Sequence, residues 1–182
     1  MRSLLIAAVS LAAAAGLAPA PVSAQATSSD LQAELIAQLD DARDKLIQLA
    51  EAIPQEKYSW RPGEGVRSVS EALMHVVGAN YYFPTLAGVE APEGLSRDME
   101  TTVTDKGEVI AALKSSFEHL RTNLRSAGEA DLNQPAKMFG QDTTRRNVYI
   151  AAVVHTHEHL GQLIAYARTN GVVPPWSAAA GD

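Results

Sequence analysis

Two histidines spaced four residues apart, His155 and His159, are the side chains in this sequence best suited to chemistry. On an α-helix that spacing places both imidazoles on one face, one turn apart. Neutral imidazole is a common ligand for zinc, nickel, copper and iron, and a helical pair with this spacing can supply half of a metal site. The pair therefore predicts a metal site, provided that a third ligand comes from another part of the chain.

His75 is the candidate for that third ligand. It falls within a helix predicted over residues 68–82, on the same face as Ala72 and Ala79, at the spacing of a buried stripe. The small residues around it, including Gly78, leave room beside the ring. An isolated histidine on such a face is more often a hydrogen-bonded core residue than a ligand, so the helical pattern leaves both interpretations of His75 open.

The other polar side chains near these positions are assigned other roles. His157 and His119 each lie about 200° around their helices from the inward face, so both are predicted to face solvent, outside the site. Glu158 points about 100° away from the ligand face. Glu71, one turn before His75, is equally well explained as a helix cap. Consequently no catalytic residue is assigned.

Four amphipathic helices are predicted to position the histidines. They span roughly residues 29–53, 68–82, 104–127 and 143–170, each with apolar residues at alternating three- and four-residue steps. Capping pairs that begin at Ser29, Ser68 and Asp105 mark three of their starts. Connections that contain proline and glycine separate the helices, and the longest, residues 84–103, is expected to cross one end of the bundle. The pattern predicts an all-α fold, an antiparallel four-helix bundle.

The first 24 residues have the pattern of a secretory signal peptide. Arg2 supplies a positive charge, residues 4–17 form an apolar run, and small residues follow two prolines. The run is shorter than the ~20 apolar residues that span a membrane, although an uncleaved anchor is the alternative. We therefore expect cleavage after Ala24 or Ala26, export to the periplasm or the cell exterior, and a single mature domain over residues 25–182.

The composition limits the kinds of ligand and partner. The 182 residues include 15 basic and 21 acidic side chains, and this acidic balance gives no reason to expect binding to nucleic acid or to an anionic membrane. The absence of cysteine excludes disulfides, thiolate nucleophiles and lipid attachment through a thiol, so nitrogen and oxygen atoms must hold any metal. We expect a small-molecule substrate and no stable membrane insertion after cleavage, and a homodimer is left open.

The order of these motifs resembles that of the DinB-like superfamily of four-helix metal-binding proteins. The likeness covers roughly residues 31–175 and rests on three segments: His75 after Trp60-Arg61-Pro62-Gly63-Glu64-Gly65-Val66-Arg67-Ser68-Val69; His155-x-x-x-His159 followed by Leu160-Gly161-Gln162; and Tyr166 to Pro175. The resemblance implies that His75, His155 and His159 bind one divalent metal, zinc or nickel. The better-understood members are cytoplasmic transferases or isomerases that use low-molecular-weight thiols, which an exported member would not meet.

Three histidines from two helices would leave coordination positions open. Structural zinc sites usually have four protein ligands, whereas an open three-nitrogen site suits Lewis-acid chemistry. The sequence therefore predicts a metal-dependent hydrolase or transferase of unknown substrate. Two alternatives stay open: a non-catalytic bundle in which the ion stabilises the fold or a dimer, and a bundle with a vestigial site. The histidines also need acceptors for their other nitrogens, and Gln162, three residues after His159, is placed to serve.

The mature N-terminus is predicted to be Gln25 or Thr27, because small residues precede both positions after the proline-broken apolar run. Mass spectrometry of protein recovered from outside the cytoplasm should find one of these termini. An exported protein that still begins at Met1 would contradict the prediction.

Overall fold

The computed structural model describes residues 28–96 and 98–180 of the chain. In chain order the elements are α1 (Ser28–Ala52), the 3₁₀ helix η1 (Gln55–Lys57), α2 (Val69–Leu86), α3 (Met99–Thr102), α4 (Lys106–Ser126), α5 (Glu129–Leu132), β1 (Pro135–Met138), β2 (Gln141–Thr144), α6 (Arg145–Thr169) and α7 (Pro175–Ala180). The predicted signal peptide and both cleavage positions lie outside the described residues. Within the described ranges, no helix combines the length and apolarity needed to cross a membrane.

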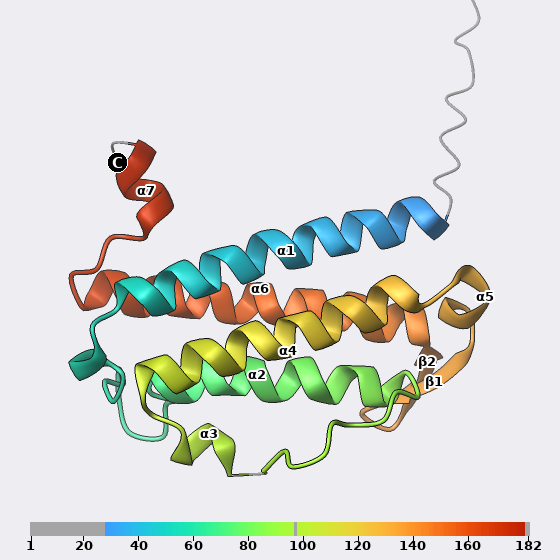
Figure 1. Cartoon of the computed structure of the whole chain (residues 1–182), viewed down its shortest axis with the longest axis horizontal. Coiled ribbons are helices and arrows are strands. Elements are labelled where there is room, and N and C mark those ends of the chain that lie inside the picture. The colour runs from blue at the N-terminus through green and yellow to red at the C-terminus, as the bar shows by residue number, and fades with distance from the viewer. Residues whose placement is uncertain (1–27, 97, 181–182) are drawn as a thin grey trace, which may run out of the picture.

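Four long helices, α1, α2, α4 and α6, form a bundle, which confirms the predicted all-α architecture (Figure 1). α1 and α2 lie diagonally opposite, and each packs against both α4 and α6. The neighbouring pairs α1/α4 and α2/α6 run antiparallel, whereas α2/α4 and α1/α6 run parallel. α2 and α4 are parallel because the link between them, which contains α3, returns along the side of the bundle. The prediction that this link crosses one end of the bundle was therefore wrong.

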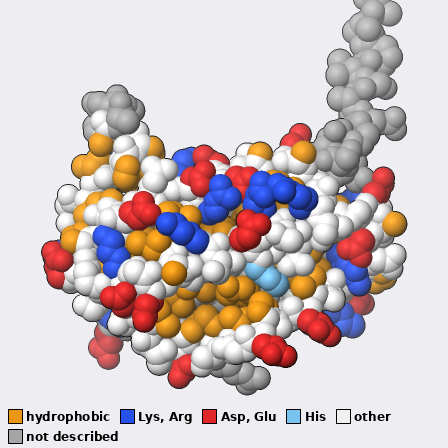
Figure 2. Space-filling model, in the orientation of Figure 1, with side chains coloured by type: hydrophobic (Ala, Val, Ile, Leu, Met, Phe, Trp, Pro, Cys, Tyr) orange, Lys and Arg blue, Asp and Glu red, His pale blue; other side chains and the backbone are white. Residues whose placement is uncertain are grey.

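The predicted apolar stripes form the core. On α1 the stripe is buried from Leu39 to Ile53, and it is half-buried nearer the start of the helix, at Leu31 and Leu35. Each fully buried leucine contributes roughly 1.5–3 kcal/mol relative to an exposed one. Charged side chains are spread over the face seen in Figure 2, except for a hydrophobic area over α2 between α4 and α3. The matching residues on α4 and α6 are buried as well: Val109, Leu113, Phe117, Leu120 and Leu124, with Val148, Ala152 and Leu163.

The predicted starts of α2 and α4 are confirmed. Ser68 and Glu71 form a complete capping box, in which the Glu71 amide donates to Ser68 Oγ (3.3 Å) and the Glu71 carboxylate accepts from the Ser68 amide (2.7 Å). Asp105 accepts from the Glu108 amide at 3.0 Å. These bonds satisfy amide groups that the first turn of a helix leaves without partners.

Two features at helix ends differ from the prediction. Gln32, expected to help cap α1, instead donates to the carbonyls of Leu124 (2.6 Å) and Ala127 (2.7 Å) at the end of α4, where carbonyls lack partners within the helix. Pro84, expected to end the second helix, lies inside α2, which continues for two more residues. Proline at this position removes one hydrogen bond of the helix, the one to the Asn80 carbonyl four residues earlier.

The connections contain more regular structure than the sequence predicted. The link after α2 includes α3, and the segment after α4 includes α5 and an antiparallel hairpin of β1 and β2. The hairpin turns at Phe139 and Gly140, whose φ angles of 50° and 81° fit a type I′ turn. We did not predict this turn, because type I′ turns usually contain Asn-Gly or Asp-Gly and this one contains Phe-Gly. α7 begins at Pro175, a helix position that tolerates proline.

The segment between α1 and α2 closes one end of the bundle, as predicted. Tyr58 is buried, and its hydroxyl donates to the Ala50 carbonyl at 2.7 Å. That carbonyl needs an outside donor because Pro54, four residues later, has no N–H. Trp60 packs edge-on against Tyr166 of α6, with ring centroids 5.3 Å apart. The segment is therefore an ordered plug.

Tyr58→Phe is expected to lower the free energy of unfolding by about 1–2 kcal/mol, because the buried Ala50 carbonyl would lose its donor. Tyr82→Phe is the matched control, since the Tyr82 side chain is 47% exposed. Urea unfolding followed by circular dichroism measures both. Equal stability of the two variants would show that the Tyr58 hydroxyl makes no net contribution.

Candidate metal centre

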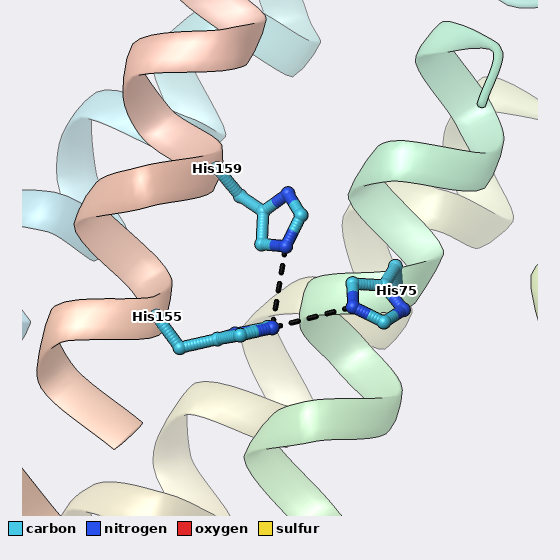
Figure 3. A group of neighbouring side chains, drawn as sticks. All are labelled: His75, His155 and His159. Carbon is cyan, nitrogen blue, oxygen red and sulfur yellow. Dashed lines mark hydrogen bonds between the residues drawn. The ribbon is translucent and has the colours of Figure 1, made fainter. Parts of the chain in front are cut away.

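The structure brings the three predicted histidines together between α2 and α6 (Figure 3). His155 Nε2 lies 3.2 Å from His75 Nε2 and 3.2 Å from His159 Nε2. One nitrogen of each ring lies within 4.8 Å of the other two. The three rings, contributed by segments that are 80 residues apart in the chain, therefore direct nitrogen atoms at a common centre.

Helix packing explains this convergence. His155 and His159 lie one turn apart on α6, on the flank that faces α2. α2 runs antiparallel to α6 and carries His75 on the opposite wall of the gap between them. All three side chains are half-buried, so the cluster lies at the edge of the core.

The outer nitrogens of two rings form hydrogen bonds that determine where their protons lie. His75 Nδ1 lies 2.9 Å from Glu100 Oε2, and His159 Nδ1 lies 2.7 Å from Gln162 Oε1. Both partners are acceptor oxygens, so each Nδ1 carries the proton and each Nε2 presents a lone pair to the centre. The orientation of Gln162 is supported because its Nε2 donates to the Tyr166 hydroxyl at 2.7 Å. The acceptor role that we predicted for Gln162 agrees with this geometry.

Glu100 is the member of the cluster that the sequence did not indicate. It lies on α3, and its Oε1 accepts from Arg67 Nε at 2.6 Å while its Oε2 accepts from His75. Burial by itself would raise the pKa of Glu100, but the hydrogen bonds from Arg67 and His75 outweigh that effect and lower the pKa. The carboxylate therefore stays charged. Nothing in the sequence distinguished Glu100 as a partner of the histidines, because it is an acidic residue in a connection that has no diagnostic motif.

His155 differs from the other two histidines. Its Nδ1 is buried and has no hydrogen-bond partner among the described residues. Burial, followed by the proximity of His159 and His75, lowers the pKa of His155 to about 4, so the ring is neutral at neutral pH. Burial also lowers the pKa of His159, although the hydrogen bond with Gln162 partly offsets it. If its proton moves to Nδ1 when an ion binds, His155 adds a third Nε2 lone pair to the same centre.

This set of donors fits a divalent metal ion. Without an ion, the separations of 3.2 Å are those of hydrogen bonds in which His155 Nε2 carries the proton, and a bound cation would take the place of that proton. Two nitrogens bound to one tetrahedral ion at about 2.0–2.1 Å would be about 3.3 Å apart. The two observed separations of 3.2 Å are close to that value. Neutral imidazoles are also typical ligands of zinc and of other late divalent metals.

His119 and His157 lie outside the cluster, as predicted, but neither is fully exposed. The His119 ring packs against Tyr81, with centroids 5.2 Å apart, and burial lowers its pKa. His157 Nδ1 donates to the Val153 carbonyl one turn earlier, at 2.9 Å. The helical phase was therefore right, and the exposure was overestimated because each ring folds back onto neighbouring groups.

The two acidic residues considered in the sequence analysis, Glu71 and Glu158, have other roles than contact with the histidine cluster. Glu71 caps α2 through Ser68 and also accepts from Arg61 Nη2 at 2.9 Å. Glu158 is exposed on α6. The capping explanation of Glu71 is thus confirmed, and neither side chain is assigned to catalysis.

A family model for the DinB superfamily matches residues 38–163, a range that contains all three histidines. The chain belongs to the DinB superfamily. Among curated proteins, YjoA of Bacillus subtilis strain 168 is 28% identical over 127 residues, which are 68% of this chain and 80% of YjoA. The crystal structure of YjoA, a DinB-like protein, matches with a TM-score of 0.61 at 25% identity and covers 76% of this chain and 92% of YjoA.

Two further solved structures share the fold at lower identity. A DinB-like protein from Bacillus cereus matches with a TM-score of 0.68 at 17% identity and covers 78% of this chain and 93% of its own. YfiT from Bacillus subtilis matches with a TM-score of 0.63 at 18% identity, and the shares covered are 81% and 92%. YfiT is described as a probable metal-dependent hydrolase with an unusual four-helix bundle topology. These likenesses confirm the four-helix bundle.

The metal-free protein is predicted to lose stability as the pH falls from about 6.5 to about 4. The fold lowers the pKa of His155 to about 4 from an unfolded value of about 6.5, so the unfolded chain binds more protons in this range. Because the ring is only half-buried, we expect a contribution of about 2 kcal/mol. The stability advantage of the wild type over His155→Gln, measured by urea unfolding with a chelator present, should shrink across this range. Parallel pH profiles would contradict the prediction.

Proposed function

We propose that this DinB-superfamily protein is a metal-dependent hydrolase. The observation that carries the proposal is the convergence of three imidazole nitrogens beside a cavity of about 670 Å³, whose walls include His75 and His155. A site with three protein ligands and an adjoining cavity leaves room for a substrate, whereas a structural zinc site is usually closed by a fourth ligand. The description of YfiT as a probable metal-dependent hydrolase with this fold supports the proposal.

In this proposal each polar residue of the cluster has a distinct role. His75, His155 and His159 hold a divalent ion, zinc or nickel. Such an ion supplies Lewis acidity to an oxygen atom of the substrate or of water. Glu100 and Gln162 fix the tautomer and the orientation of two ligand rings. Both Glu100 oxygens are already engaged by Arg67 and His75, so Glu100 is a positioning residue rather than a general base.

We also propose that the protein acts outside the cytoplasm. The support is the N-terminal pattern of a charged residue, an apolar run and small residues at a cleavage site. An exported enzyme would not meet the cytoplasmic low-molecular-weight thiols that thiol-dependent transferases and isomerases of this superfamily require. Hydrolysis needs only water as a second reactant. Export therefore favours a hydrolase over a thiol-dependent transferase.

A second candidate function is structural. The ligands come from both α2 and α6, so one ion would join these two helices. In that case the ion would raise stability and no catalysis would depend on it. The adjoining cavity favours the hydrolase, because a purely structural ion has no need of one.

Alanine at His75, His155 or His159 is expected to lower zinc or nickel affinity at least about 100-fold, more than the 10- to 100-fold typical of removing a hydrogen-bond partner of a ligand. Glu100→Gln should cost about 10-fold. With metal at about 100 times its dissociation constant, the wild type should gain about 2.7 kcal/mol of stability, and the alanine variants should lose that gain. Isothermal titration calorimetry and thermal unfolding measure these effects.

His119→Ala and His157→Ala are the matched controls, because both histidines lie outside the cluster. Each should keep the metal affinity of the wild type. Hydrolysis of nitrophenyl acetate should exceed the rate with the metal-free protein only when metal is bound, and this increase should be lost in His155→Ala. If metal binds and stabilises the protein, but no hydrolysis of this or other neutral esters and amides depends on it, the structural alternative holds. Unchanged metal affinity in all three triad variants would overturn both functions.

A further inference from the structure

The cavity beside the triad is large enough to enclose an organic molecule. Its volume of about 670 Å³ lies within the range of roughly 300–1,000 Å³ that is usual for small-molecule sites. α2 forms one wall, the link that carries α3 forms another, and the tip of the β1–β2 hairpin contributes Phe139. Figure 2 shows the hydrophobic area between α4 and α3, over α2. His75 and His155 connect this cavity to the triad.

The walls are mainly apolar and aromatic. Tyr81, Tyr82 and Phe83 follow one another on α2 and all line the cavity, and methionines 74 and 99 add flexible, polarisable side chains. Aromatic rings and methionine thioethers form favourable contacts with the faces and edges of other rings. Gly78 has no side chain to occupy the space. The wall therefore suits a flat ring system better than a highly hydrated ligand.

The described lining offers no uncompensated charge. Apart from the histidines of the triad, Glu100 is the only acidic or basic residue among the lining residues that the structure describes, and both of its oxygens are bonded, to Arg67 and to His75. In the metal-free protein, an anionic group placed in this cavity would lose hydration without gaining a cationic partner from these residues, which is costly. A cationic group would have to compete with Arg67 for the carboxylate. The cavity thus favours an uncharged group.

A ring bound in this cavity would also explain why two aromatic side chains lie exposed at the surface. Phe139 is 72% exposed, and its φ of 50° places it in the left-handed region that favours glycine or asparagine. Tyr82 is 47% exposed. A large apolar side chain in this conformation helps neither solubility nor turn formation, but at the rim of an apolar cavity it can cover a bound ring.

We propose that this cavity binds an uncharged, ring-bearing organic group, and that neutral aromatic esters or amides are the substrate class on which the triad acts. The inference rests on the proposed hydrolase function for the second part, whereas binding of the ring requires no metal. Gly78 and Phe139 are then specificity-determining residues: Gly78 provides space on the floor of the cavity, and Phe139 covers its rim.

The test uses the metal-free full-length mature protein and a matched pair of probes, β-naphthol, which is neutral at neutral pH, and β-naphthoate, which is anionic. Equilibrium dialysis with fluorescence detection should show saturable binding of β-naphthol and at least about tenfold weaker binding of β-naphthoate. Gly78→Leu should weaken β-naphthol binding at least about tenfold by occupying the cavity. A Cβ at Gly78 meets no atom within 4 Å, and leucine is a better helix former than glycine, so this variant should fold.

Gly161→Leu is the matched control, since Gly161 is also helical and exposed, has no atom within 4 Å of an added Cβ, and does not line the cavity. It should bind β-naphthol like the wild type. Phe139→Ser, at an exposed position, gives a second variant that should weaken binding without loss of stability, whatever happens to Gly78→Leu. Absence of β-naphthol binding, equal binding of both probes, or binding that neither variant affects would overturn the inference.

The two proposals can fail separately. If β-naphthol binding depends on Gly78 and Phe139 but no metal binds the triad, the ring site stands and the hydrolase fails. If metal binds and β-naphthol does not, the hydrolase stands and this substrate class is wrong. If both the metal site and the ring site exist, Gly78→Leu should reduce metal-dependent hydrolysis of β-naphthyl acetate and leave zinc affinity unchanged.

Discussion

The packing of α2 against α6 is the contact on which the candidate metal site depends. Two histidines on one helix can supply only part of a three-nitrogen site, and the third must approach from a neighbouring helix at a fixed position. A shift of one residue on α2 would rotate His75 by about 100° away from its partners. Buried side chains on both helices, among them Leu73 and Val76 on α2 and Thr156 and Leu163 on α6, hold this register because close packing tolerates few alternatives.

A second level of support comes from hydrogen bonds that converge on Arg67. On one side His75 bonds to Glu100, which pairs with the Arg67 side chain. On the other side the last histidine of the triad bonds to Gln162, whose amide reaches the Tyr166 hydroxyl, and that hydroxyl donates to the Arg67 carbonyl at 3.2 Å. The residue just before the N-cap of α2 thus fixes both outer rings. Such contacts orient ligand rings before an ion binds, which reduces the ordering required on binding.

The combination of a nitrogen-only cluster and an apolar cavity has chemical consequences. Burial disfavours the protonated forms of His155 and His159, and this preserves the lone pairs that a cation needs. The cavity adjoins the same cluster, so a ligand bound there would exclude water from one side of it, and electrostatic interactions are stronger where water is excluded. In the function that we propose, a metal ion next to a largely uncharged cavity would act on a neutral, poorly hydrated molecule, and the acidic composition of the chain gives no reason to expect a nucleic-acid substrate.

The sequence by itself determined the local features of this protein. Spacings of three or four residues predicted the four helices, the caps at Ser68 and Asp105, and the common face of His155 and His159. They do so because side chains at these spacings lie on the same face of an α-helix. The resemblance to DinB-type proteins added His75, whose helical pattern alone had left two interpretations open.

Only the tertiary structure decided which distant groups meet. Glu100 reaches His75 because the link after α2 returns along the bundle, and no local pattern encodes that path. The same holds for Gln32, which satisfies the end of α4 rather than its own helix, and for Phe139, which a hairpin turn without Asn or Asp brings to the cavity. Contacts within one helix depend on short-range geometry, whereas contacts between a helix and a connection depend on how the whole chain packs.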